Sequence, residues 1–196
     1  MPIWLSVHAG LLAIAVAPGG PSVAGLSPPE RRMLDPMRER LLRPEVLLDA
    51  LALRGDESVA DVGAGPGFFT LRLARRLPRG RVIAIDVDGP ALAVLQRRAA
   101  AAGLRNVETR QVGPEDPGLA PASMALAFLC QVDQYLPDRA RYFRALRRAL
   151  RPGGRLVLVN YRRFEALDRD AATAAGFHAV LAAVAPPGYF VLIGDR

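Results

Sequence analysis

One stretch of the chain, Val59–Thr70, constrains the fold more than any other: it reads V-A-D-V-G-A-G-P-G-F-F-T. It begins as a short apolar strand at 59–62 and breaks into a turn with glycines at 63, 65 and 67. Apolar and basic residues then recur at helical spacing over 68–77. A strand, a glycine turn and a helix in this order present a nucleotide at the carboxyl end of the first strand of a doubly wound α/β fold. Glycines suit the turn because a side chain would block the ligand and because such turns often need positive φ.

The spacing of the acids around this turn indicates which nucleotide is bound. A second strand, Arg81–Asp86, follows the helix and ends in an acid that can accept hydrogen bonds from ribose hydroxyls. Dinucleotide-binding proteins use G-x-G-x-x-G, whereas this turn reads D-V-G-x-G-x-G, with Asp61 two residues before the first glycine. That pattern resembles motif I of the class I S-adenosylmethionine-dependent methyltransferases. The later R-P-G-G-R-L-V-L-V at 151–159 is a second block of the same resemblance.

The resemblance implies a fold, a cofactor and a set of contact residues. The fold is α/β: a Rossmann-like, doubly wound, seven-stranded and mostly parallel sheet with strand 7 antiparallel, over residues 30–196, with helices before the first strand that cover the cofactor. The cofactor is S-adenosyl-L-methionine, and the product is S-adenosyl-L-homocysteine. We expect contacts from the first turn, the end of strand two, the loop after strand three and the end of strand four, namely from Asp61, Gly63, Ala64, Gly65, Gly67, Asp86, Val87, Glu115, Asp116 and Leu129.

The segment after the fourth strand, 130–135, faces the transferable methyl in this family. Many relatives that act on small molecules carry His-His late in the segment, where this chain has Gln134 and Tyr135. Asp133 and Tyr135 are therefore the candidate catalytic groups, although hydrogen bonding within the loop is the alternative interpretation of both. Cys130 is interpreted as a small apolar residue at a strand end rather than as a nucleophile. No pattern of metal ligands is present.

The helices before the first strand supply weaker candidates. Arg40, Arg43 and Glu45 could reach the pocket, and surface charge is the alternative for each. The patterns predict helices at 30–42 (interrupted near Pro36), 44–53, 68–77, 91–102, 138–150 and 166–175. They predict strands at 59–62, 81–86, 106–112, 124–129, 156–160, 178–184 and 189–193.

Composition limits the partners. The net charge of +7 invites a nucleic-acid interpretation, but all 26 basic residues are arginine and the basic doublets fall on different elements. We therefore expect a methyltransferase that moves a methyl group to an O, N or C nucleophile of a small molecule. An RNA methyltransferase and a non-catalytic subunit that binds cofactor or a partner are the alternatives, and a homodimer is left open.

The first residues, 1–29, form an apolar arm or signal-like segment followed by a Pro/Gly linker. The apolar run, Trp4–Ala17, is short for a membrane span, and no Lys or Arg precedes it as in an export signal. We expect a cytoplasmic protein without a transmembrane span, with an export signal or a membrane-associated arm as the alternative.

Overall fold

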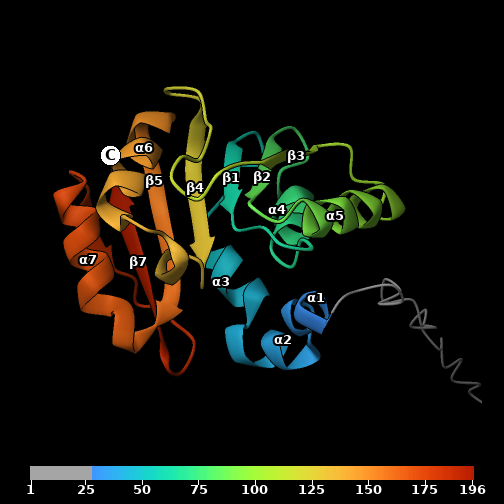
Figure 1. Cartoon of the computed structure of the whole chain (residues 1–196), viewed down its shortest axis with the longest axis horizontal. Coiled ribbons are helices and arrows are strands. Elements are labelled where there is room, and N and C mark those ends of the chain that lie inside the picture. Colours follow the sequence, from blue (N-terminus) through green and yellow to red (C-terminus); the bar gives the residue numbers. More distant parts are fainter. Residues whose placement is uncertain (1–27) are drawn as a thin grey trace, which may run out of the picture.

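The computed structural model describes residues 28–196, which fold around one seven-stranded sheet (Figure 1). The strands lie in the order β3-β2-β1-β4-β5-β7-β6. Parallel pairing joins β3 through β5, and β7 is antiparallel to both of its neighbours. This topology confirms the predicted fold class. The strand bounds are β1 Ser58–Val62, β2 Arg81–Asp86, β3 Val107–Gln111, β4 Met124–Cys130, β5 Leu150–Tyr161, β6 His178–Leu181 and β7 Tyr189–Asp195.

Helices alternate with most of the strands. The predicted interruption near Pro36 is confirmed, because the first helix ends at Met33 and Asp35 caps the next by accepting a hydrogen bond from the Met37 amide at 2.7 Å. The bounds are α1 Pro28–Met33, α2 Pro36–Leu42, α3 Pro44–Ala50, α4 Thr70–Arg76, α5 Gly89–Ala101, α6 Arg139–Ala149 and α7 Glu165–Ala174. Two short 3-10 helices follow strands, η1 Asp133–Tyr135 and η2 Arg162–Phe164.

Several predicted element bounds differ from the structure, among them the following three. The strand predicted at 156–160 begins at Leu150, because Leu150 already pairs with Met124 of β4 before the R-P-G-G turn. The helix predicted from residue 68 begins only at Thr70, since the third glycine of the turn, Gly67, has φ +89° and the chain has not yet entered the helix. The strand predicted at 178–184 ends at Leu181.

The core lies on both faces of the sheet, as expected for a doubly wound fold. Alternate residues of each strand face opposite sides, so that Val59 packs with α3 and α4 while Ala60 packs with α6 and α7. Helix α5 covers β2 through Leu92 and Leu95, which contact Ala84. All seven residues of β4 are buried, which agrees with its central place.

Strand β1 pairs in parallel with β2 on one side and with β4 on the other. The order of strands along the chain reverses there, and the segments leaving β1 and β4 diverge to opposite faces. In doubly wound sheets a ligand binds in the crevice at this switch point, outside the carboxyl ends of the strands. The fold therefore places the glycine turn after β1 and the segment 130–135 after β4 side by side.

The helices before β1 cover this end of the sheet. Leu47, Leu48 and Leu51 of the α3 segment are buried in the core. Two arginines of α4 hold the same helices by ion pairs: Arg72 reaches Glu39 and Glu45, and Arg76 reaches Glu45 and Asp49, at 2.5–3.1 Å. In Figure 1, α1 to α3 lie below the sheet, at the end toward which β4 runs.

The predicted apolar arm and any export signal lie outside the described residues. Helix α1 begins at Pro28, within the segment predicted as a linker. Across 28–196, no helix combines the length and the apolar character needed to cross a membrane.

Candidate active site

The glycine turn after β1 has the backbone geometry that its sequence predicts. Gly63, Gly65 and Gly67 have φ of +69°, +52° and +89°, a region that residues with a Cβ rarely adopt. A Cβ at Gly63 would lie 2.2 Å from Cγ2 of Val132, and one at Gly67 would lie 2.3 Å from Cδ1 of Leu95. The turn therefore needs glycine both for its conformation and for the close approach of the neighbouring segments.

The acid before the turn, Asp61, is held in a buried position. Its Oδ2 accepts a hydrogen bond from the hydroxyl of Thr70 at 2.5 Å, and the two residues are 3% and 0% exposed. Burial raises the pKa of Asp61 to about 7, against the lowering effect of the Thr70 hydrogen bond. The charge of Asp86 raises this pKa further, and the guanidinium of Arg38 lowers it.

The acid that ends β2, Asp86, is oriented by backbone amides. Its Oδ2 accepts from the Gly65 amide at 2.7 Å, and its Oδ1 accepts from the Asp88 amide at 3.0 Å. The side chain stays half-buried and faces the glycine turn. Val87, the next residue, is exposed, and its carbonyl accepts from the side chain of Gln111.

The loop after β3 carries two exposed acids with different local roles. Glu115 lies 3.6 Å from Arg141 of α6 as an ion pair. Asp116 accepts a hydrogen bond from the Gly118 amide at 2.8 Å and thereby stabilises its own turn. Neither side chain lines the cavity described next.

A cavity of about 640 Å³ lies at the carboxyl ends of β1, β4 and β5. Four of the predicted site residues line it: Asp61, Gly63, Ala64 and Tyr135. The others do not, and Leu129 in particular is fully buried in the core of the sheet. The remaining wall is formed by Arg32, Met33, Arg38, Pro66, Phe68, Phe69, Cys130, Gln131, Val132, Gln134, Tyr161 and Arg163.

The two predicted catalytic residues have different surroundings. Tyr135 is 77% exposed at the cavity rim, whereas Asp133 is 0% exposed and does not line the cavity. Asp133 Oδ2 accepts a hydrogen bond from Asn160 at 2.7 Å, and Asn160 also donates to Gln134 at 2.9 Å. The side chain of Asp133 thus fixes the turn that carries Gln134 and Tyr135, in keeping with the alternative of loop hydrogen bonding.

A second buried acid lies beside Asp133. Asp168 of α7 is also 0% exposed, and Arg139 of α6 faces both carboxylates, with its Nε 3.2 Å from Asp168 and 3.8 Å from Asp133. Burial, together with the neighbouring Asp133 carboxylate, raises the pKa of Asp168 to about 8. The Asp168 carboxyl therefore ionises less readily than that of an exposed aspartate.

Sequence reasoning missed Arg38 of α2, which lines the cavity. Its Nη2 donates to Gln131 at 3.1 Å, and its guanidinium lies 4.8 Å from the ring centre of Phe68. Its Nε is buried and has no hydrogen-bond partner among the described residues. Helical spacing could have found it, because Arg38 lies four residues before the buried Leu42 and so shares its face. The expected Arg40, Arg43 and Glu45 do not line the cavity.

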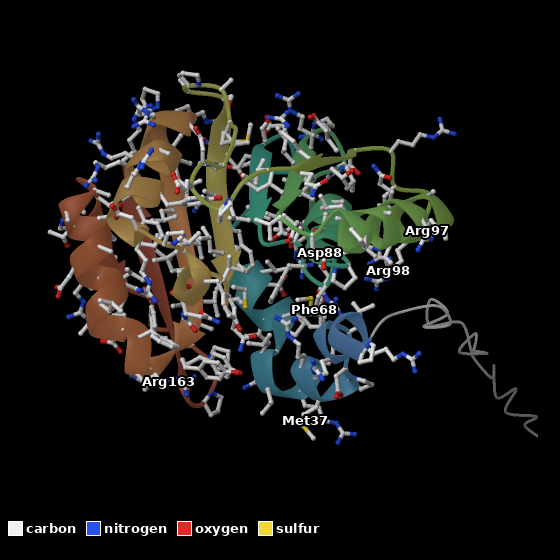
Figure 2. The ribbon with its side chains drawn as sticks, in the orientation of Figure 1. Met37, Phe68, Asp88, Arg97, Arg98 and Arg163 are labelled. Atoms are coloured by element: carbon white, nitrogen blue, oxygen red, sulfur yellow. The ribbon has the colours of Figure 1, made fainter. Side chains whose placement is uncertain are left out.

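Tyr161 lines the cavity where β5 ends, and other aromatic rings lie around it. The rings of Tyr161 and Tyr189 stack at 4.8 Å. The guanidinium of Arg163 lies 4.9 Å from the ring centres of both Tyr161 and Phe164. Figure 2 shows Arg163 at the lower edge of the molecule, where α2 also lies with Met37.

Other reactive groups contribute little to this wall. Burial raises the pKa of the Cys130 thiol to about 12, so the thiol is neutral and not nucleophilic at ordinary pH. Across residues 28–196, no group of three or more His, Cys, Asp or Glu side chains could hold a metal ion.

Comparison with known proteins bears on both the sequence and the fold. Residues 59–154 match a family model described as a methyltransferase domain. The trans-aconitate 2-methyltransferase of Azoarcus sp. (strain BH72) is 35% identical over 128 residues, which are 65% of this chain and 48% of that protein. An uncharacterized methyltransferase of Mycobacterium tuberculosis (strain ATCC 25618 / H37Rv) is 34% identical over 118 residues, 60% of this chain and 57% of that protein. The chain spans only 32% to 57% of the length of such curated relatives.

Solved structures resemble the whole described fold. The crystal structure of an S-adenosylmethionine-dependent methyltransferase from Aquifex aeolicus superposes with a TM-score of 0.79 at 22% identity. The match covers 87% of this chain and 98% of that one. The helices and strands therefore have the arrangement of that fold nearly from end to end.

Proposed function

Because the chain belongs to the class I S-adenosylmethionine-dependent methyltransferases, we propose that it transfers the methyl group of this cofactor to a nucleophile of a small molecule. The cavity carries the proposal. Its wall joins Asp61 and the glycine turn to the segment after β4 and the end of β5 in one space of about 640 Å³. Such a volume is typical of small-molecule sites, which measure roughly 300–1,000 Å³.

The described residues fit the cofactor at both of its ends. At the ribose end, Asp86 is half-buried, faces the glycine turn and offers carboxylate oxygens to hydroxyl groups. At the amino-acid end, the Asp61 carboxylate would face the ammonium of the cofactor. The guanidinium of Arg38, with its buried and unpaired Nε, would face the carboxylate of the cofactor.

The cofactor supplies a methyl group already bonded to a good leaving group, so the protein does not have to activate it. The chain has to hold the acceptor in line with that methyl, and alignment of this kind supplies much of the acceleration in two-substrate reactions. Gln134 and Tyr135 lie at the wall that faces the methyl in this family. Asp133 and Asn160 fix the turn that carries them, so we assign Asp133 a positioning role.

The relatives named trans-aconitate 2-methyltransferase support a small acceptor and supply the first compound to test. The spread of the arginines supports the same conclusion. Arg72 and Arg76 are engaged in ion pairs with the cover helices and do not form a free track for nucleic acid.

Calorimetric titration with S-adenosylmethionine and S-adenosylhomocysteine tests the proposal, followed by an assay of methyl transfer to candidate acceptors. Wild type should bind both ligands, and Asp86→Ala should lose most of the affinity because the ribose hydroxyls lose their acceptor. Asp170→Ala is the control, since Asp170 is an exposed residue of α7 and is not among the expected cofactor contacts. Binding without transfer to any acceptor would favour a non-catalytic subunit instead.

A further inference from the structure

The cavity wall carries more positive charge than the cofactor needs. Arg32, Arg38 and Arg163 line it, and Asp61 supplies the one carboxylate among the described lining residues. Arg38 and Asp61 lie close enough for the charge of Arg38 to lower the pKa of Asp61. Both are assigned to the amino-acid end of the cofactor. Arg32 and Arg163 remain for the other substrate.

Arg163 is held in place without being neutralised. Its guanidinium rests against the rings of Tyr161 and Phe164, each 4.9 Å away, and such stacking restricts a long side chain. The nearby Glu165 instead pairs with Arg162 and Arg169. Within the described part of the chain, neither Arg163 nor Arg32 has an ion pair. An oriented guanidinium that lines a cavity without a carboxylate partner is suited to bind a carboxylate from a ligand.

No free carboxylate or thiolate among the described residues of the same wall could serve as the base for an acceptor that must lose a proton. Asp61 belongs to the cofactor end, and Asp133 is fully buried behind the turn. The Cys130 thiol, with its pKa raised to about 12, stays protonated. Gln131 and Gln134 already accept hydrogen bonds from Arg38 and Asn160. An acceptor that arrives as an anion needs no base, since general-base catalysis serves nucleophiles that remain protonated.

From these two observations, and resting on the proposed methyl transfer, we infer that the acceptor is a small carboxylic acid anion. Arg163 binds its carboxylate, Arg32 faces it from the cover helices, and the product is a methyl ester. A carboxylate oxygen forms the new bond to the methyl carbon while the methyl–sulfur bond breaks and its electron pair remains on sulfur. The negative charge of the carboxylate and the positive charge of the sulfonium cancel, so no proton has to leave.

The test uses a panel of acceptors with methyl-labelled S-adenosylmethionine. Small mono-, di- and tricarboxylates, with trans-aconitate among them, are each paired with the corresponding amide, and alcohols, phenols and amines complete the panel. We expect labelled products from carboxylates alone, and mild alkali should release their label as methanol, as it does from methyl esters. Label that is stable to alkali, on an amine or a phenol, would overturn the inference and leave the proposed methyl transfer standing. Cofactor binding without transfer to any class would count against the proposed function itself.

Paired variants then test Arg163. Arg163→Gln should raise the KM for the carboxylate tenfold or more and leave cofactor affinity unchanged, because charge-assisted hydrogen bonds are the stronger kind. Arg162→Gln is the matched control: both arginines are exposed, but the guanidinium of Arg162 pairs with Glu165 at 3.6 Å and does not line the cavity. Arg163→Lys keeps the charge and should recover part of the loss. Equal KM values for Arg163→Gln and Arg162→Gln would remove Arg163 from acceptor binding.

Discussion

Replacing Asp168 by Asn should flatten the dependence of the protein's unfolding free energy on pH. Asp168 and Asp133 are both fully buried beside the single guanidinium of Arg139. Burial, strengthened by the neighbouring Asp133, raises the pKa of Asp168 to about 8. A proton on Asp168 would also supply a donor where Asp133 Oδ1 and both oxygens of Asp168 have no hydrogen-bond partner among the described residues.

The sign and the size follow from proton binding. An unfolded aspartate has a pKa of about 3.9, so between pH of about 4 and 8 the folded chain holds a proton that the unfolded chain has released. The stabilisation from this proton is fully present below pH of about 4 and is lost as the pH rises toward 8. One proton corresponds to at most about 1.4 kcal/mol per pH unit, hence about 2–3 kcal/mol between pH 5 and 7.

Urea unfolding followed by circular dichroism at pH 5, 6 and 7 measures this difference. Between pH 5 and 7, the wild type should lose about 2–3 kcal/mol more stability than Asp168→Asn, since Asn carries no titrating proton. Asp61, with its pKa also raised, adds a slope of the same sign to both proteins and cancels from the comparison. Asp170→Asn, an exposed change on the same helix, should follow the wild type. Parallel curves for wild type and Asp168→Asn would refute the reasoning.

Three further substitutions test the cavity. The cofactor affinity of the wild type should rise between pH 6 and 8, because burial raises the pKa of Asp61 to about 7 and only the ionised form attracts the cofactor ammonium. Asp61→Asn should abolish this rise. Calorimetry at both pH values measures it, and a rise that persists in the variant would contradict the reasoning. Gly63→Ala should weaken cofactor binding about tenfold or more, because its Cβ would lie 2.2 Å from Val132 at a strained φ of +69°. Adding Val132→Ala should recover only part of that affinity, since the backbone strain remains, and unchanged binding in the single variant would show that the turn accepts a side chain. Tyr135→Phe should lower kcat more than cofactor affinity in the methyl-transfer assay, and an unchanged kcat would exclude its hydroxyl from the reaction.

Local sequence patterns were sufficient to predict the strands and the glycine turn at the site. The bounds of β2 agree with the prediction to the residue, because Gly80 precedes the strand and the strand ends in an acid that its neighbours orient. The local motif was also sufficient to select Asp61, Gly63 and Ala64, which line the cavity. Their positions depend only on the strand and the glycine turn that contain them.

The direction of a side chain depends on segments far away in the sequence, and there the predictions were incomplete. The pattern placed Asp133 in the segment after β4, but its burial depends on Asn160 at the end of β5 and on residues of α6 and α7. Likewise, no local pattern indicates that Arg38 and Arg163 line one cavity, because they come from opposite sides of the sheet's carboxyl end.

The ion pairs that tie the cover helices to α4 have a consequence for how the cavity opens. Such partly exposed pairs each contribute only ~0–1 kcal/mol and weaken as salt screens them. Apart from Leu42, the side chains of α1 and α2 that the structure describes are exposed or only partly buried, whereas the strand ends on the other side of the cavity belong to the sheet. The wall formed by α1 and α2 is therefore held weakly, whereas the wall formed by the strand ends is held by the sheet. Amide hydrogen exchange should be fast in α1 and α2, rise further with ionic strength, and stay slow in β4 and β5.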